Sequence, residues 1–150
     1  MNIYLKEIDE LNFEECVLLT TNKENKHFIG EEFVASNAYS IAQSKIEQGW
    51  IIKAIYAEDA IVGFTMYGYC YEDKYYELCR MMIDHKYQGK GYGKAALVKV
   101  IEEMKNIEDC DEIFLSFDMD NFKAKSLYES LDFKDTGKVI DDELLYSLKL

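Results

Sequence analysis

The chain has 150 residues, of which 49% are hydrophobic and 31% charged, so it suits one compact domain (1–150) and leaves no length for a second. Lysine and arginine number 17 against 29 aspartate and glutamate residues, and the resulting net charge of −12 repels phosphate backbones. Nucleic acid is therefore not an expected partner, whereas a small polycationic amine would be attracted to an acidic cleft.

The sequence also lacks the segments that direct a protein to a membrane. No stretch approaches the roughly 18 to 20 apolar residues that span a bilayer, and the first residues do not resemble a secretion signal. We therefore expect a cytoplasmic protein without a membrane partner. With only two histidines and no C-x-x-C pair, no metal site is expected. The isolated cysteines are expected to be reduced and mostly buried thiols: Cys16, Cys70, Cys79 and Cys110.

The first half of the chain predicts a short strand, two helices and an antiparallel meander. The strand covers Ile3–Leu5, and Phe13, Cys16 and Val17 then recur at helical spacing. After a polar, irregular segment at residues 21–35, Ser36 or Asn37 can cap a second helix that Gly49 would end. Three strand-like runs with acidic turns between them follow: Trp50–Tyr56, Ile61–Tyr69 and Tyr75–Asp84.

The second half predicts two further passes of helix and strand. An apolar stripe at helical spacing runs through residues 91 to about 105, and a short strand follows at Ile113–Phe117. A last helix, capped by Asp120 or Asn121, precedes closing strands at Phe133–Val139 and Leu144–Leu150. The expected fold is α/β (α+β), with a mixed sheet of six or seven strands, helices on both faces and a β-helix-β crossover in the second half.

The most informative segment is QGKGYGKAAL, which places three glycines where a strand gives way to a helix. Free N–H groups at a helix start bind anions, because the unpaired donors and the helix dipole both favour negative charge. The first turn carries Lys90 and Lys94 instead of the usual acids, which favours an anion between them. The segment therefore predicts a phosphate-bearing ligand.

Two common phosphate motifs do not fit this segment. A P-loop needs a glycine five residues before Gly93 and Ser or Thr after Lys94, but Gln88 and Ala95 stand there. A dinucleotide fingerprint can be read at Gly91, Gly93 and Ala96, but that motif opens a fold too large for the residues that follow.

A third motif fits the spacing. Gln88, Gly91 and Gly93 match the pattern Q/R-x-x-G-x-G/A, which resembles the acetyl-CoA loop of the GCN5-related N-acetyltransferase (GNAT) family. The resemblance implies a GNAT-type, mostly antiparallel sheet and acetyl-CoA as co-substrate. It also implies that main-chain groups of Met82 and Ile83 bind the pantetheine arm. The loop residues implied to bind the pyrophosphate are Gln88, Gly89, Lys90, Gly91, Tyr92, Gly93 and Lys94.

A second part of the family pattern, N-x-x-A-x-x-L-Y-x-x-x-G-F, is found one strand later. Asn121, Ala124, Tyr128 and Phe133 stand at its spacing, and Asp132 replaces the expected glycine, which affects the turn after the helix. By resemblance, Asn121 and Ala124 contact the cofactor. The hydroxyl of Tyr128 would act as the general acid that protonates the departing thiolate; packing on an apolar helix stripe is its alternative role.

Transfer to an amine also requires a base, because a protonated alkylamine must first lose a proton. Glu77 lies 11 positions before Gln88, a spacing similar to that of the catalytic glutamate in the histone acetyltransferase branch of the family. An exposed strand carboxylate, or a partner for Arg80, is the other interpretation of Glu77. We expect direct transfer in a ternary complex, without a covalent enzyme intermediate.

The acceptor follows from a wider resemblance. The segments FVASNAYSIAQ, RMMIDHKYQGKGYGKAAL and LYESLDF resemble the spermine/spermidine acetyltransferases of Gram-positive bacteria. The resemblance implies a small polyamine as substrate, with Glu31, Glu32 and Tyr39 as amine contacts, and a homodimer is possible because dimers are common in the family. Other acceptors are an aminoglycoside, an amino acid or a protein N-terminus. A non-catalytic CoA-binding regulatory module is the alternative outside enzymes.

Overall fold

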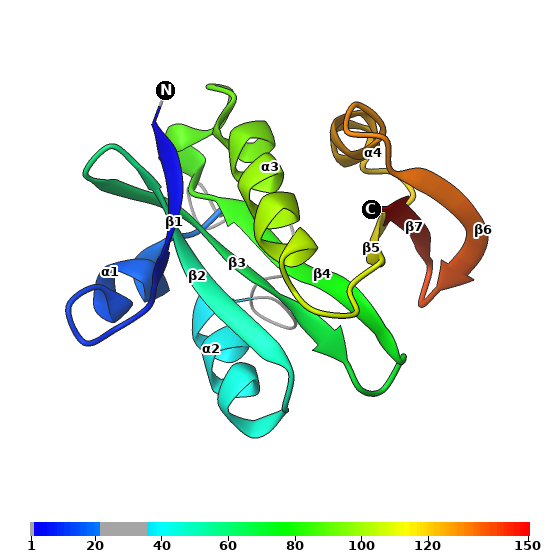
Figure 1. Cartoon of the computed structure of the whole chain (residues 1–150). Helices are drawn as coiled ribbons and strands as arrows, with labels where there is room; N and C mark the ends of the chain where they lie inside the picture. Colours follow the sequence, from blue (N-terminus) through cyan, green and yellow to red (C-terminus); the bar gives the residue numbers. More distant parts are fainter. Residues whose placement is uncertain (1, 22–35) are drawn as a thin grey trace.

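The computed structural model describes residues 2–21 and 36–150 as one seven-stranded sheet with helices on both faces (Figure 1). The expected fold class, mixed and mostly antiparallel, is confirmed. The elements in chain order are β1 (Ile3–Glu7), α1 (Phe13–Leu18), α2 (Asn37–Ile46), β2 (Trp50–Ala57), β3 (Ala60–Cys70), β4 (Tyr75–Ile83), the 3-10 helix η3 (His85–Tyr87), α3 (Tyr92–Lys105), β5 (Glu112–Asp118), α4 (Phe122–Glu129), β6 (Lys134–Ile140) and β7 (Glu143–Lys149).

The strands follow the order β1-β2-β3-β4-β5-β7-β6 across the sheet. Neighbouring strands are antiparallel except β4 and β5, which are parallel and joined through α3, so this is the predicted crossover. The last strand, β7, lies between β5 and β6 and pairs with both. Sequence periodicity finds the two closing strands but does not show which of them is next to β5.

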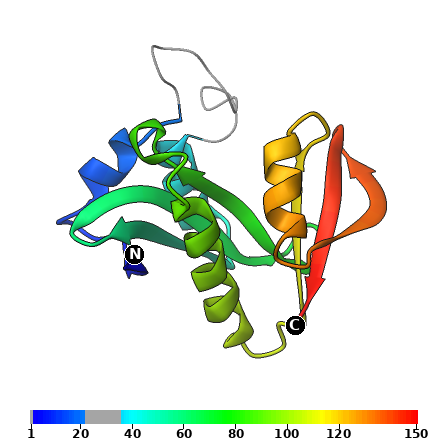
Figure 2. The ribbon, with the colours of Figure 1, turned by 90° about the horizontal axis from the view of Figure 1, so that it is seen from above.

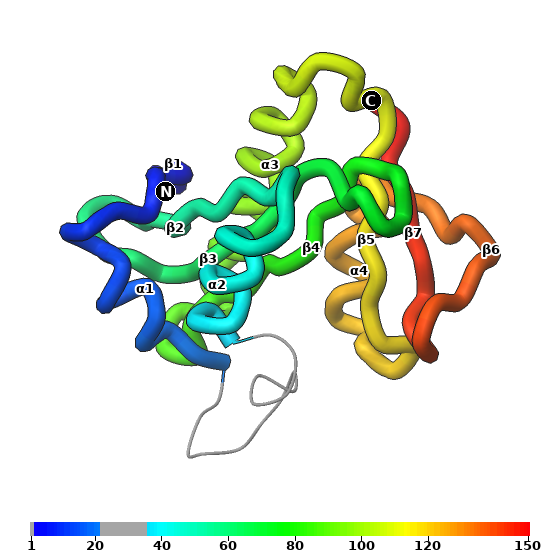
Figure 3. The backbone as a smooth tube through the Cα atoms, turned by 90° about the horizontal axis from the view of Figure 1, so that it is seen from below, coloured from blue at the N-terminus to red at the C-terminus, as the bar shows by residue number. Residues whose placement is uncertain are grey.

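The helices cover the sheet because each carries one apolar face. The side chains of Leu97, Val100 and Met104 on α3 are fully buried against one face, while α1 and α2 lie on the other, as Figure 3 shows from below. The shorter helix α4 packs Tyr128 against Phe117 of β5, with ring centroids 5.4 Å apart. Helices therefore cover both faces of the sheet.

Several elements begin or end one to three residues from their predicted bounds, and the ends of α2 and β4 show the physical reason. Ser36 caps α2 as expected, its Oγ accepting from the Tyr39 N–H at 3.0 Å, but α2 ends at Ile46 and not at Gly49. Gly49 instead has φ +97° in the turn before β2, where a Cβ would lie 2.4 Å from the carbonyl oxygen of Tyr69. β4 ends at Ile83, because the Asp84 carboxylate accepts from the Lys86 N–H at 3.0 Å and starts η3.

Strands β4 and β5 pair at one position and then separate. The two strands are in register at Glu77 and Phe114, and the register gives no further pair toward the C-terminal ends of the strands. Cys79 forms a bulge in β4, since Met66 pairs with Arg80 and the next residue, Tyr67, pairs with Leu78. The facing edges of β4 and β5 therefore separate, with α3 on one side and α4 on the other (Figure 2). An extended ligand can lie along such unpaired edges.

All four cysteines are free, and three of them are buried, as expected for reduced thiols. Within residues 2–21 and 36–150, no helix has the length and apolar character needed to cross a membrane.

Candidate active site

The glycine loop leads into α3 with the geometry of an anion site. Gly89 and Gly91 have φ +77° and +83°, a left-handed conformation that glycine adopts without strain. Helix α3 starts at Tyr92 with no side-chain cap and no acidic residue in its first turn. Its first internal backbone bond is donated by the Ala95 N–H to the Gly91 carbonyl at 3.2 Å. The preceding N–H groups are therefore available to a ligand.

Basic side chains surround this loop although the protein is strongly acidic. The Nζ atoms of Lys86 and Lys90 lie 5.7 and 5.8 Å from the ring centroid of Tyr87. Lys94 occupies the first turn of α3, where a cation is unfavourable unless an anion is near. The loop thus provides N–H donors and cations that fit a pyrophosphate.

Gln88 has a structural contact that the motif did not reveal. Its Nε2 donates to the Ile83 carbonyl oxygen at 2.9 Å, so the side chain ties the loop to the end of β4. Main-chain groups of a strand alternate between its two neighbours, and the Asp84 N–H bonds to Val62 on β3 at 2.8 Å. Ile83 and Met81 consequently face the free edge, whereas Met82 faces β3.

This alternation separates the two residues predicted to bind the pantetheine arm, Met82 and Ile83. Met82 is buried, and its Sδ lies 3.8 Å from Nδ2 of Asn37, which also donates to the Cys16 carbonyl at 2.9 Å. Met82 therefore anchors α1 and α2 to β4. The main-chain donors that can reach a ligand at the free edge belong to Ile83 and Met81. That Met82 or Ile83 contacts pantetheine remains a prediction.

The downstream motif forms the start and end of α4. The Asn121 carboxamide oxygen accepts from the Ala124 N–H at 3.0 Å, so Asn121 is the N-cap, and Ala124 is partly buried. Asp132 has φ +70°, the conformation for which a glycine was expected. Aspartate tolerates this region better than most residues. The turn before β6 therefore forms without the family's glycine.

Tyr128 lies on α4 between aromatic rings. The centroid of its ring is 5.4 Å from that of Phe117 and 5.8 Å from that of Phe133. Burial, with the nearby charge of Glu143, raises the pKa of its hydroxyl to about 12. Among the described residues no hydrogen bond to this hydroxyl is found. Tyr128 therefore keeps its proton at neutral pH and has a donor to offer.

Glu77 lies on β4 where the sheet begins to divide, opposite Phe114 of β5. Burial and the negative charge of Asp73 raise its pKa to about 7, and Arg80 only partly opposes this shift. Removal from water penalises the charged form of a carboxyl group. A carboxylate with this pKa is suited to accept a proton near neutral pH.

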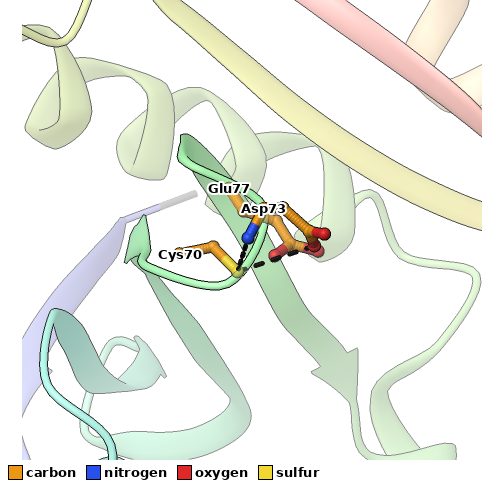
Figure 4. A group of neighbouring side chains, drawn as sticks. All are labelled: Cys70, Asp73 and Glu77. Carbon is orange, nitrogen blue, oxygen red and sulfur yellow. Dashed lines mark hydrogen bonds between the residues drawn. The ribbon is translucent and has the colours of Figure 1, made fainter.

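Glu77 belongs to a compact group with Cys70 and Asp73 (Figure 4). Their donor atoms lie within 4.8 Å of one another, and the Cys70 Sγ is 3.6 Å from a carboxylate oxygen of Asp73. Burial raises the pKa of the Cys70 thiol to about 11. The thiol therefore stays neutral, and the group concentrates carboxylate charge where β3 turns into β4.

Glu143 is a neighbour of both candidate catalytic residues, and sequence reasoning missed it. It opens β7, accepts from the Ser116 hydroxyl at 3.2 Å, and raises the pKa values of Tyr128 and Glu77. The charge of one carboxylate thus acts on both Tyr128 and Glu77, although 50 residues separate them in sequence. The sequence carried no sign of this role for Glu143, because it depends on β7 lying next to β5, and hydrophobic periodicity does not predict the order of strands in a sheet.

Of the three residues predicted to contact the amine, the structure describes only Tyr39. Tyr39 lies in the first turn of α2 with 55% of its surface exposed, so it is accessible. Glu31 and Glu32 lie outside the described residues, and their role stays a prediction.

Replacing Gly91 tests the anion site. Gly91→Ala should destabilise the protein by about 1 kcal/mol, because alanine is strained at φ +83°. It should also weaken CoA binding about tenfold or more, since the N–H groups lose their alignment. Gly93→Ala is the matched control, because a Cβ there meets Ile83 at an ordinary 3.7 Å. Melting temperature and calorimetric CoA affinity measure both effects; equal CoA affinity in the two variants would contradict the assignment.

Comparison with known proteins agrees with this geometry. A model of the acetyltransferase (GNAT) family matches residues 7–133. The spermine/spermidine N(1)-acetyltransferase of Bacillus subtilis is 36% identical over 91 residues, which cover 57% of this chain and 60% of that protein. An N-acetylaspartate synthetase of Xenopus tropicalis is 38% identical over 82 residues, covering 55% of this chain and 30% of that one. The matched segments span less than two thirds of either relative.

A solved structure shares the fold over almost the whole chain. The spermidine N-acetyltransferase of Vibrio cholerae, in complex with CoA and spermine, superposes with a TM-score of 0.73 at 16% identity, covering 98% of this chain and 95% of that one. The family match includes β4, the glycine loop and α4, the elements that form the candidate site. The chain therefore belongs to the acetyltransferase (GNAT) family.

Proposed function

We propose that this protein transfers an acetyl group directly from acetyl-CoA to a primary amine of a small linear polyamine such as spermidine or spermine. The observation that carries the proposal is the convergence of three features: an anion site at α3, a protonated Tyr128 and a Glu77 carboxylate with a raised pKa. The name of the Bacillus subtilis relative, which matches part of the chain, supports the polyamine as acceptor.

Each candidate residue has one step in the proposed mechanism. Glu77 takes a proton from the bound ammonium group, and the neutral nitrogen then attacks the thioester carbonyl carbon. The N–H groups of Met81 and Ile83 are available at the free edge of β4 to polarise the carbonyl oxygen. As the bond from carbon to sulfur breaks, Tyr128 gives its proton to the sulfur. The nitrogen loses its second proton as the amide forms, and this proton, passed through solvent, restores the Tyr128 hydroxyl. No covalent bond to the enzyme forms, so sequential kinetics are expected.

The charge distribution supports a cationic acceptor. Asp73, Glu77 and Glu143 gather carboxylates on the part of the sheet where β4 and β5 meet, away from the basic glycine loop. The region suited to a pyrophosphate is thus positively charged, and the region suited to an amine is negatively charged. Such a field raises the local concentration of a cation at the reacting end.

An acceptor panel tests the proposed substrate class. Thiol release from acetyl-CoA would be followed with spermine, spermidine, putrescine, an aminoglycoside, free amino acids and a lysine peptide. We expect the largest kcat/KM with spermine or spermidine and intersecting double-reciprocal lines. A higher kcat/KM for a non-polyamine would overturn the polyamine assignment and keep the acetyltransferase. If CoA raises the melting temperature and every amine is inert, catalysis itself is contradicted.

A further inference from the structure

A hollow of about 510 Å³ lies beside the candidate base and has no role so far. It is lined by residues from the end of α2, the start of β2 and the β3–β4 turn: Glu47, Gln48, Trp50, Cys70, Tyr71 and Glu72. We call it the Trp50 hollow. Cys70 also belongs to the group within 4.8 Å of Glu77, so one side chain is shared between the hollow and the candidate base.

The sheet register fixes how far this hollow is from the base. Trp50 of β2 pairs with Gly68 of β3, and Gly68 pairs with Glu77 of β4. Residues paired directly across strands have their side chains on the same face. Two strand spacings therefore separate Trp50 from Glu77, roughly 10 Å on one face of the sheet. This distance suits two charged groups of one extended ligand.

One carboxylate of the Trp50 hollow is held in place by the surrounding side chains. Glu47 accepts from the Trp50 indole N–H at 3.3 Å and from the Gln43 carboxamide at 2.8 Å. Gln43 in turn accepts from an Arg80 guanidinium nitrogen at 3.4 Å. The Glu47 carboxylate is thus oriented before any ligand binds, which lowers the entropy cost of binding a cation there.

Aromatic rings form the walls of the hollow. Tyr71 is 62% exposed, and its ring packs edge-on against Tyr69 with centroids 4.9 Å apart. A Cβ on Gly49 would approach the Tyr71 ring to 3.0 Å, so glycine at this turn permits the ring position. Aromatic faces next to carboxylates attract ammonium groups and pack on methylene chains. The chemistry therefore selects a cation on an apolar chain over an anion or a neutral polar ligand.

We propose that the Trp50 hollow is a second cation subsite, which holds a distal ammonium group of the acceptor between Glu47 and Glu72 while the reacting nitrogen lies beside Glu77. This inference rests on the proposed function and adds a selection rule to it. The preferred acceptor carries at least two amino groups joined by an apolar chain long enough to connect the hollow to Glu77. A monoamine reaches only the reacting position.

The test compares spermidine with butylamine in Glu47→Gln and Glu72→Gln variants. We expect the KM for spermidine to rise about tenfold at low salt with kcat nearly unchanged, and the KM for butylamine to stay constant. The difference should shrink at high salt, where exposed charges are screened. Glu14→Gln, which removes an exposed carboxylate from α1, is the matched control and should match the wild type. Equal effects on both amines, or none, would overturn the subsite.

A binding measurement separates this inference from the proposed function. Calorimetry would titrate spermidine into the CoA complex of the wild type and of Glu47→Gln, with no reaction required. Weaker binding to the variant supports the subsite even if no amine is acetylated. Equal affinity for the two proteins contradicts the subsite even if spermidine proves to be the substrate. Tyr71→Ala, which removes one wall, should also weaken spermidine binding, and unchanged affinity would count against the hollow.

Discussion

Tyr128→Phe should lower kcat by roughly 10²- to 10⁴-fold and leave the affinity for acetyl-CoA nearly unchanged. The substitution removes one hydroxyl group and keeps the ring between Phe117 and Phe133. Without the hydroxyl, the thiolate leaves unprotonated. Steady-state kinetics with saturating amine and a calorimetric CoA titration measure the two quantities separately.

The control for this prediction removes a hydroxyl elsewhere. The Tyr4 hydroxyl bonds to the Glu58 carbonyl at 2.9 Å, next to the β2–β3 turn, so Tyr4→Phe should retain the wild-type kcat. A kcat of Tyr128→Phe equal to that of the wild type would remove Tyr128 from the mechanism. A loss of CoA affinity with unchanged kcat would make it a binding residue instead.

Glu77 determines the expected pH dependence. Its carboxyl group must be deprotonated to act as a base and has a pKa of about 7, so kcat/KM should rise with pH up to about 7 and then level off. Glu77→Gln should lower the plateau by roughly 10²-fold and abolish this acidic limb. Rate profiles of the two proteins between about pH 5 and pH 9 give the comparison. An acidic limb that persists in the variant would assign the titration to another group.

Protein stability gives a second readout of the same group. The pKa of Glu77 rises from 4.5 to about 7 on folding, so its contribution to stability is fully present below 4.5 and is lost as the pH rises through 7. At about pH 8, Glu77→Gln should therefore be more stable than the wild type by about 2 kcal/mol, a value reduced for partial solvent screening. Denaturant unfolding at about pH 8 and about pH 4.5 tests this. An equal effect of Glu77→Gln on stability at both pH values would mean that burial does not raise the pKa of this carboxyl group.

Local signals in the sequence were sufficient for most of the fold. The apolar stripe of α3, the cap at Ser36 and the acidic turns between β2, β3 and β4 correspond to short-range patterns, and the structure confirms them. The conformation of the glycine loop was predictable for the same reason, since its glycines are needed within a few residues of one another.

The parts that sequence reasoning missed depend on contacts between distant strands. Nothing near Glu143 indicates that β7 will lie next to β5 and bring a carboxylate to Tyr128 and Glu77. Likewise, Trp50 and Glu77 lie on the same face of the sheet only because of how β2 pairs with β3 and β3 with β4. A shift of one residue in either pairing would turn the Trp50 side chain to the other face. Alternation along β4, which directs the main-chain groups of Ile83 to the free edge, also depends on how β4 pairs with β3; that Met82 or Ile83 contacts the cofactor stays a prediction.

We propose that this chain moves an acetyl group from acetyl-CoA to a polyamine nitrogen. The most direct test incubates the protein with acetyl-CoA and spermidine, then measures released CoA and acetylated spermidine by chromatography with mass detection. We predict that the two products form in equal amounts and that both are lost in Tyr128→Phe. Release of CoA without acetylated spermidine, or equal product from the variant and the wild type, would contradict the claim.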